Sequence, residues 1–465
     1  MKKLSLLSIL SVLFFISCQT ELLDEVNPIE DSSSVLASKN SSTNKSFMVI
    51  SKAETLSQQL ELSVKQYGEI TRAIPEIGIL IVKSSDPNFT QNVSGIADVR
   101  SVVPDLTVNW LEPINVNPLA NPFSIGSDEP YFYYQWGMDA INAPEAWNAG
   151  YYGSNVKVFI LDSGIDAEHP DLAPNLNTDL SASFVPNEDW NIQPGFYFNH
   201  GTHVAGIIAA ADNQRGVIGV APKAEIVAVK VLSEYSGSGS FSGINAGIVY
   251  AANNGADVIN MSLGATLNKN GKFYDEDGNF VEKIPSKYIQ EIIHAQQRAI
   301  DYAYKKGVTI VTSAGNSAMN ADGNGSTIVL PADLNNVISV SATAPLNWAL
   351  DASTNLDLMA SYSNYGNSLI DIAAPGGDFD SPYNIYYYDM VLSTMSEGYT
   401  WTAGTSMASP HVAGVAALII GKNGGEMNPH DVEKQLFNTA DKIGTNGNSP
   451  YYGHGRVNAY RAVSE

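Results

Sequence analysis

Three polar side chains in this 465-residue chain are of types that together can cleave an acyl bond. Asp162 follows the apolar run 156–161, while His200 and Ser406 each stand in segments of small residues. A serine hydroxyl is a weak nucleophile at neutral pH and needs an adjacent base, a role that suits histidine. A carboxylate behind the imidazole holds its tautomer and stabilises its protonated form. These residues therefore predict a nucleophile, a base and an orienting acid.

The sequences around the three residues are similar to motifs of the subtilisin family of serine proteases. They read Leu-Asp-Ser-Gly-Ile-Asp at 161–166, His-Gly-Thr-His-Val-Ala-Gly at 200–206 and Gly-Thr-Ser-Met-Ala-Ser-Pro-His at 404–411. Their order of Asp, His and Ser is that of the family. The resemblance covers roughly residues 128 to 460 and implies a serine endopeptidase that hydrolyses polypeptides through an acyl-enzyme. It also assigns Asn316, in Thr-Ser-Ala-Gly-Asn, to the oxyanion hole.

Strands and helices alternate from residue 128 onward. The apolar runs predict strands at 156–161, 225–232, 258–263 and 308–312, and helical patterns lie between them at 243–253 and 288–305. This alternation predicts an α/β fold with a mostly parallel, doubly wound sheet flanked by helices. Active sites in such sheets lie beyond the carboxyl ends of the strands, which is where Asp162 stands.

The resemblance also implies which segments bind the substrate. They are Gly237, Ser238 and Gly239 on one side of the cleft, and Ser262, Leu263 and Gly264 on the other. An extended peptide between two such segments gains main-chain hydrogen bonds. A plain flexible loop is the alternative for 237–239, and Phe241 either walls a distal apolar pocket or belongs to the core.

Residues 169–172 and 211–217 resemble parts of the family's strong calcium site. Calcium takes six to eight oxygen ligands from carboxylates, amides and carbonyls. Asp171 and the amide of Asn213 are the expected side-chain ligands, with carbonyls of the 211–217 loop completing the site. Asp128 or Glu129 is a further candidate carboxylate. The sequence gives no indication of an organic cofactor.

Composition limits the other classes of function. The chain has 25 Lys and Arg against 48 Asp and Glu, a net charge of −23, which argues against binding to nucleic acid. A single Cys excludes an internal disulfide and a multi-cysteine metal site. His200 and His203 lie one helical turn apart as two zinc ligands would, but no third ligand is evident. The family pattern makes His203 a packed neighbour.

Residues 1–18 are predicted to be a lipoprotein-type signal peptide, with a positive start, an apolar run and Cys18 after a small residue. An ordinary secretory signal with an incidental Cys is the alternative. Residues 19–46 are acidic and then Ser-rich, which predicts a flexible tether. We therefore expect an exported protein: an outer-membrane or cell-surface lipoprotein, or one released outside the cell after propeptide cleavage. A lipid on Cys18 would be its only membrane contact.

The region 47–108 alternates strand and helix and occupies the place of the family's inhibitory propeptide, a small α+β domain. In the family this domain assists folding and then blocks the cleft with its carboxyl end, as an intramolecular inhibitor. Residues 109–127 are expected to be a linker, 128–465 the catalytic domain, and cleavage is expected within 105–127. Such a cut would separate a lipid on Cys18 from the protease, unless the two parts stay in contact.

Two alternatives to a broadly acting protease remain open. One is a dedicated processing protease with a single target, and the other is a non-catalytic binding protein on the same fold. The presence of all three residues of the triad, together with Asn316, argues against the second alternative.

Overall fold

The computed structural model describes residues 45–111, 129–192, 200–274, 280–323, 325–380, 385–396, 398–444 and 449–465. The expected signal peptide with Cys18, most of the tether and residues 112–127 of the expected linker lie outside this set. Those predictions therefore stay predictions. No helix in the described part combines the length and the apolar character that a membrane span requires.

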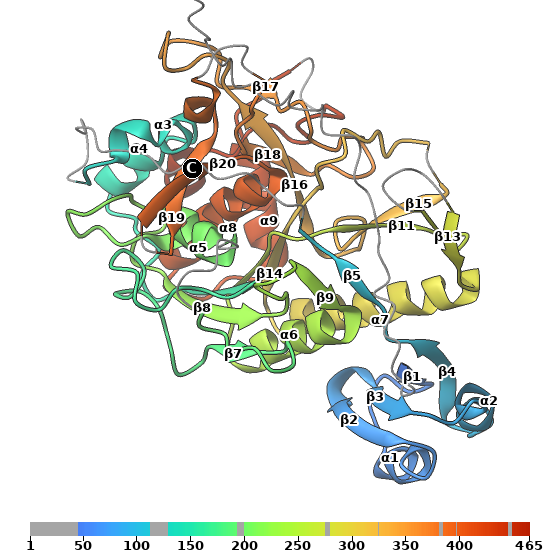
Figure 1. The fold of residues 1–465 in the computed structure, drawn as a ribbon. Coiled ribbons are helices and arrows are strands. Elements are labelled where there is room, and N and C mark those ends of the chain that lie inside the picture. Colours follow the sequence, from blue (N-terminus) through green and yellow to red (C-terminus); the bar gives the residue numbers. More distant parts are fainter. Residues whose placement is uncertain are drawn as a thin grey trace, which may run out of the picture.

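The N-terminal part of the described chain is a small α+β domain (Figure 1). It consists of β1 (Lys45–Ser51), α1 (Gln58–Val64), β2 (Glu69–Ile74), η1 (Pro75–Ile77), β3 (Ile79–Ser84), α2 (Phe89–Ser94) and β4 (Val99–Pro104). The strands form an antiparallel sheet in the order β2-β3-β1-β4. One face of the sheet packs against α1 and α2 around the buried side chains of Val49, Leu60, Leu80 and Phe89. The sequence prediction missed β2, an edge strand with little buried surface.

The central sheet of the larger domain confirms the predicted α/β class. Its strands are β6 (Lys157–Asp162), β7 (Ala182–Ser183), β8 (Glu225–Lys230), β10 (Val258–Met261), β14 (Thr309–Ser313), β16 (Ile338–Ala344), β17 (Leu358–Met359) and β18 (Ile372–Pro375). The order is β17-β16-β14-β10-β6-β8-β7, with β18 also paired to β16. Every pairing except β16 with β17 is parallel. The carboxyl ends of β6, β10 and β14 therefore meet at one edge.

Helices cover both faces of this sheet, as Figure 1 shows. They are α3 (Trp136–Ala140), α4 (Ala143–Asn148), α5 (His200–Ala209), α6 (Phe241–Asn253), α7 (Ser286–Lys305), α8 (Thr405–Lys422), α9 (Pro429–Thr439) and α10 (Ala459–Ser464), with short turns η2 (Phe132–Tyr134) and η3 (Tyr386–Asp389). Side chains alternate along β6: Val158 and Ile160 join the core with α5 and α8, whereas Phe159 and Leu161 join the core with α6 and α7. This alternation follows from the two-residue period of a strand buried on both faces.

The small domain packs against α6 and α7. Met48, Ile50 and Ile79, on the sheet face away from α1 and α2, belong to the same apolar cluster as those helices. Arg298 on α7 donates to the carbonyls of Ser51 and Ile77, at 3.3 Å each. A domain of about 60 residues has a marginal core of its own, so this shared cluster adds stability that the small domain lacks alone.

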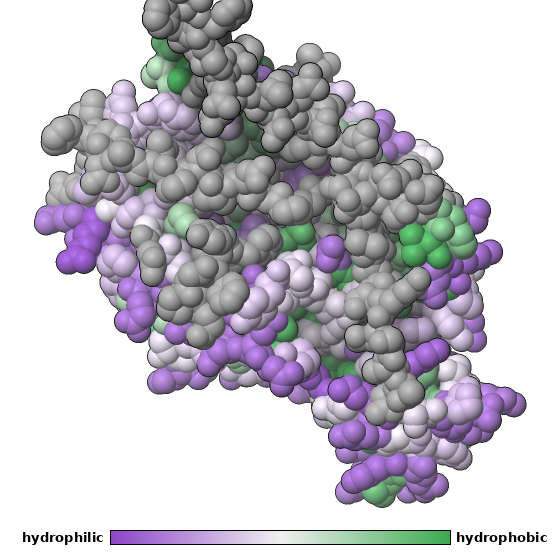
Figure 2. All heavy atoms as spheres, viewed as in Figure 1, coloured by the Kyte–Doolittle hydropathy of each residue, from purple (hydrophilic) through white to green (hydrophobic). Residues whose placement is uncertain are grey.

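Short antiparallel pairs complete the fold, and the sequence did not predict most of them. They are β5 (Thr107–Asn109) with β9 (Ser238–Ser240), β11 (Ala265–Asn268) with β15 (Thr327–Leu330), β12 (Lys272–Tyr274) with β13 (Phe280–Lys283), and β19 (Val391–Met395) with β20 (Gly398–Thr402). The chain thus continues as β5 through the expected domain boundary at residue 108. Among the residues coloured in Figure 2, hydrophilic ones predominate, and a hydrophobic patch lies where Figure 1 places β13, whose Phe280 and Val281 are exposed.

Replacing Arg298 with alanine should loosen the small domain from α7. Two carbonyl oxygens that now accept hydrogen bonds from the guanidinium would lose this donor. The loss should weaken docking of the small domain by about 1–3 kcal/mol. We expect faster hydrogen–deuterium exchange in residues 45–104 of Arg298→Ala, measured by mass spectrometry. Lys305→Ala, which removes an exposed cation from the same helix, is the matched control and should leave this exchange unchanged. Equal exchange in all three proteins would contradict a docking role for Arg298.

Candidate active site

The carboxyl end of β6 brings Asp162 and His200 together in the protein interior. Asp162 is the last residue of β6 and His200 is the first of α5. The imidazole Nδ1 lies 2.9 Å from one Asp162 carboxylate oxygen and 3.0 Å from the other. The Ser163 N–H also donates to Asp162 Oδ1, at 2.7 Å. The carboxylate therefore fixes Nδ1 as the protonated nitrogen and leaves Nε2 for another partner.

Ser406 stands in the first turn of α8, which packs against α5. Proline at 410 has no N–H, so it cannot make the helical hydrogen bond to the carbonyl of Ser406. Ser262 Oγ donates to that carbonyl instead, at 2.7 Å. In return, Ser406 Oγ donates to the Ser262 carbonyl, at 3.3 Å. The start of α8 is thus tied to one of the predicted cleft segments.

Asn316 reaches the same place from the end of β14. Its Oδ1 accepts from the Thr405 N–H at 2.9 Å and from the Thr405 hydroxyl at 2.7 Å, which turns its Nδ2 donor the other way. A Cβ built on Gly404 would lie 3.6 Å from both Asn316 Nδ2 and the Ser406 nitrogen. Two N–H groups therefore border one small space beside Gly404, as an oxyanion hole requires.

The two predicted cleft segments both bind one extended stretch of the chain itself. Strand β5 pairs with β9 so that Val108 faces Gly239 and Asn109 faces Ser238. Trp110 donates its N–H to the Gly237 carbonyl at 3.3 Å, and its own carbonyl accepts from the Gly264 N–H at 3.1 Å. Residues 107–111 therefore lie between 237–239 and 262–264.

The side chains of this stretch are also buried. The Trp110 indole donates to the Gly239 carbonyl at 2.7 Å and packs edge-on against Phe241, with ring centroids 4.8 Å apart. Leu263 is buried beneath the same cluster. Phe241 is completely buried, and it contacts the occupant of the cleft while belonging to the core. Of the two alternatives for Phe241, its place in the core is therefore confirmed.

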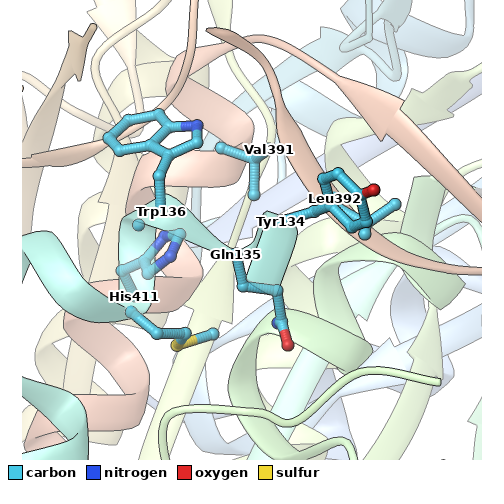
Figure 3. Close-up of a pocket in the computed structure, with 8 residues that line it drawn as sticks. Tyr134, Gln135, Trp136, Val391, Leu392 and His411 are labelled. Carbon is cyan, nitrogen blue, oxygen red and sulfur yellow. The ribbon is translucent and has the colours of Figure 1, made fainter. Parts of the chain in front are cut away.

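The other histidines close to the site are neutral, structural groups. Burial lowers the pKa of His203 to about 3, and its Nε2 lies 3.2 Å from the Thr400 carbonyl. Burial likewise lowers the pKa of His411 to about 4, and its Nδ1 lies 2.8 Å from the Met407 carbonyl. Figure 3 shows His411 beside Trp136 and Val391 around a cavity of about 10 Å³, which holds no more than a water molecule.

The residues of the expected calcium site lie around the 211–217 loop. Asp171 is fully buried, which raises the pKa of its carboxyl, and its Oδ2 accepts from the Val217 N–H at 3.1 Å. Asn213 Nδ2 lies 3.4 Å from Asp171 Oδ1. The Asn213 Oδ1 is buried and has no hydrogen-bond partner in the described part of the chain. Glu129, also buried, accepts from the N–H groups of Asn213 and Gln214, at 2.9 and 3.1 Å.

This donor set fits a hard cation. Two buried carboxylates, at Asp171 and Glu129, lie beside the same loop as an amide oxygen with no hydrogen-bond donor. Within the described ranges, no group of three or more His, Cys, Asp or Glu side chains gathers, so amide and carbonyl oxygens would have to supply most ligands. Asp128, the other candidate carboxylate, lies outside the described residues.

Known proteins resemble this chain over most of its length. The chain matches the model of the subtilase family over residues 153–455. It is 34% identical to the thermophilic serine proteinase of Bacillus sp. (strain AK1) over 399 residues, which cover 85% of this chain and 84% of that protein. It is 37% identical to thermitase of Thermoactinomyces vulgaris over 338 residues, covering 72% and 98%.

A solved structure extends the similarity to most of the described chain. The epidermin leader peptide processing serine protease (EpiP) of Staphylococcus aureus superimposes with a TM-score of 0.71 at 26% sequence identity. The match covers 91% of this chain and 98% of that one. Together with the family match, these similarities show that the chain belongs to the subtilase family of subtilisin-like serine peptidases.

Proposed function

We propose that this protein is a serine endopeptidase that cleaves polypeptides through an acyl-enzyme on Ser406. The observation that carries the proposal is the buried pair of Asp162 and His200, joined through Nδ1 at 2.9 Å, on a helix that packs against α8, whose first turn carries Ser406. A carboxylate bound to Nδ1 makes Nε2 the basic nitrogen, which can accept the proton of a serine hydroxyl. The residues that contact His200 and Ser406 lie at the carboxyl ends of central strands. Asp162 is the last residue of β6, and Ser262 directly follows β10.

A residue of this chain can be assigned to each step of the proposed reaction. Ser406 Oγ attacks the carbonyl carbon of the substrate while His200 Nε2 takes the hydroxyl proton. The oxygen of the tetrahedral intermediate receives hydrogen bonds from Asn316 Nδ2 and the Ser406 N–H. His200 then gives the proton to the leaving amine as the peptide bond breaks. Water, deprotonated by the same imidazole, releases the acyl group and restores Ser406.

Residues 47–108 are proposed to be an inhibitory propeptide. The pairing of β5 with β9 and the bonds of Trp110 to Gly237 and Gly264 support this role, because they occupy the backbone groups that a substrate would use. Cleavage within 105–127 would free the cleft. We also propose export as a lipoprotein through Cys18. The contacts of Arg298 with the small domain are then a means of keeping a cleaved enzyme attached to its anchor.

A narrow processing role is the second candidate. EpiP is described as a leader peptide processing protease, and its chain is covered almost completely by the match. Profiling with a peptide library separates the two candidates. Cleavage of many unrelated sequences and of denatured proteins supports the degradative role, whereas one short recognition sequence supports the processing role.

Replacing Ser406 with alanine should abolish both peptide hydrolysis and self-processing, because it removes the hydroxyl that forms the acyl-enzyme in the proposed reaction. A fluorophosphonate should label the unmodified protein at Ser406 and leave Ser406→Ala unlabelled, as measured by mass spectrometry. Ser353→Ala, in an exposed loop, is the control for a serine that takes no part. An unlabelled unmodified enzyme would favour a binding protein on this fold, and persistent processing of Ser406→Ala would point to another protease.

Replacing Asn316 with alanine should lower kcat about 100- to 1000-fold, the range known for one oxyanion donor of a related subtilisin. The Michaelis constant should change little, since the donor acts on charge that develops in the transition state. Steady-state kinetics on a peptide substrate measures both constants. Asn320→Ala changes an exposed amide in the same loop and should retain full activity. An Asn316→Ala variant in which KM rises while kcat is unchanged would contradict the role proposed for Asn316.

We propose in addition that Asp171 and Asn213 bind a structural calcium ion, with carbonyls of the 211–217 loop and Glu129 nearby. The support is the unpartnered amide oxygen of Asn213 next to two buried carboxylates. A bound cation would offset the cost of burying those charges and would fix the loop.

Removing calcium with a chelator should lower the unfolding temperature, and adding calcium back should restore it. At a calcium concentration 100 times the dissociation constant, binding stabilises the folded state by about 2.7 kcal/mol. Scanning calorimetry measures the shift. Asp171→Asn should remove the calcium-dependent part, whereas Asp179→Asn, an exposed acid in the same region, should keep it. A calcium response that survives in Asp171→Asn would place the ion elsewhere.

A further inference from the structure

A fully buried lysine lies next to the candidate catalytic acid. Lys230 ends β8, and in the parallel pairing of β6 with β8 its register partner is Asp162. Its side chain has no exposed surface. A buried ammonium is costly unless hydrogen bonds and opposite charges satisfy it, so a lysine in this place requires partners.

Three segments supply those partners. Lys230 Nζ donates to the Ser163 carbonyl at 2.8 Å, and it lies 3.2 Å from Glu188 Oε2 and 3.4 Å from Glu234 Oε2. The Glu234 N–H also donates to Glu188 Oε2, at 3.0 Å. Glu188 belongs to the loop after β7, and Glu234 to the turn that leads into β9. One ammonium therefore joins the loop after Asp162 to a turn that shapes the substrate cleft.

Ser163 carries the effect of Lys230 to the triad. Its N–H donates to the Asp162 carboxylate at 2.7 Å, and its hydroxyl accepts from the Gly201 N–H at 3.1 Å. Gly201 is the residue after His200. Holding the carbonyl of Ser163 thus limits movement of both the acid and the helix that presents the imidazole.

We propose that Lys230 is a positioning residue for catalysis, which fixes Ser163 and balances the charge of Glu188 and Glu234 around the Asp162–His200 pair. This inference rests on the proposed function of that pair. It predicts two separable effects: loss of the ammonium should reduce turnover by loosening the triad, and it should make the surroundings of His200 more negative.

Two further titratable side chains near this region are those of His203 and Asp166. His203 is neutral because burial lowers its pKa to about 3. The carboxylate of Asp166 accepts from the Glu168 N–H at 2.9 Å and the Ser396 hydroxyl at 3.1 Å. The charges of Lys230, Glu188 and Glu234 can be altered by substitution without changing the proposed triad.

The test is the pH profile of kcat/KM in the variants Lys230→Met, Lys230→Arg and Glu188→Gln. Activity requires a neutral His200. The fall of kcat/KM at low pH, called the acid limb, therefore reports the protonation of His200. Lys230→Met removes a positive charge and favours the imidazolium, so the acid limb should move to higher pH by about 0.5–1 unit. Glu188→Gln removes a negative charge and should move it to lower pH. Lys230→Arg keeps the charge and should leave it in place.

Turnover gives the second readout. Normalised to the sites titrated by a fluorophosphonate, Lys230→Met should lose about 10-fold or more in kcat with little change in KM. Lys223→Met removes an exposed cation just before the other end of β8 and is the matched control, with no change in kcat or in the acid limb. If Lys230→Met does not fold, Glu188→Gln still tests the inference, because the acid limb of this variant should lie at lower pH than that of the unmodified enzyme.

The same titration can be followed without turnover, by nuclear magnetic resonance of the labelled His200 ring in the full chain. This keeps the inference testable if the enzyme does not react with the fluorophosphonate, an outcome that would count against the proposed function alone. His200 titrating at higher pH in Lys230→Met supports the inference. An unmoved His200 in both Lys230→Met and Glu188→Gln, or equal shifts in Lys223→Met, would overturn it.

Discussion

The close approach of α5 to the carboxyl end of β6 is the constraint on which the candidate site depends. The hydrogen bond between Asp162 and His200 forms only if the first turn of α5 touches the backbone after β6. A Cβ at Gly201 would overlap the carbonyl oxygen of Gly164, so no larger residue fits there. The small residues that follow His200 let the helix sink completely into the core. The acid and the base are thus aligned by backbone packing more than by their own contacts.

A second close fit brings the nucleophile to the same edge. Helix α8 is buried along most of its length, so its first turn cannot obtain hydrogen bonds from water. The carbonyl of Ser406, deprived of its helical donor by Pro410, is satisfied by Ser262. The missing helical hydrogen bond is thus replaced by one that ties α8 to Ser262, the residue after β10. The proposed nucleophile and one proposed substrate-binding segment therefore share one network, and small displacements in either would reach the other.

Much of this was predictable from the sequence, for identifiable reasons. Continuous apolar runs predict buried parallel strands well, and the motifs around Asp162, His200 and Ser406 predicted where these residues lie. Strand β2 was not predicted because it is a half-exposed edge strand. Strand β5 was not predicted because it is short and its partner, β9, is distant in the chain; β9 itself was expected only from the family resemblance, as a strand of the cleft. Lys230 gave no signal at all. A lysine at the end of an apolar run is usually solvated, and only the structure reveals its burial and its three oxygen partners.

The arrangement of residues 107–111 connects folding with control of the site. Strand β9 and the segment 262–264 present backbone groups that can pair with an extended chain. In the structure that partner is the chain's own β5 with Trp110, held by the bonds that a substrate would make. The apolar cluster shared by the small domain with α6 and α7 keeps this segment at a high local concentration. An outside peptide would have to compete with this segment for the same backbone groups, which is how the proposed propeptide would block the cleft.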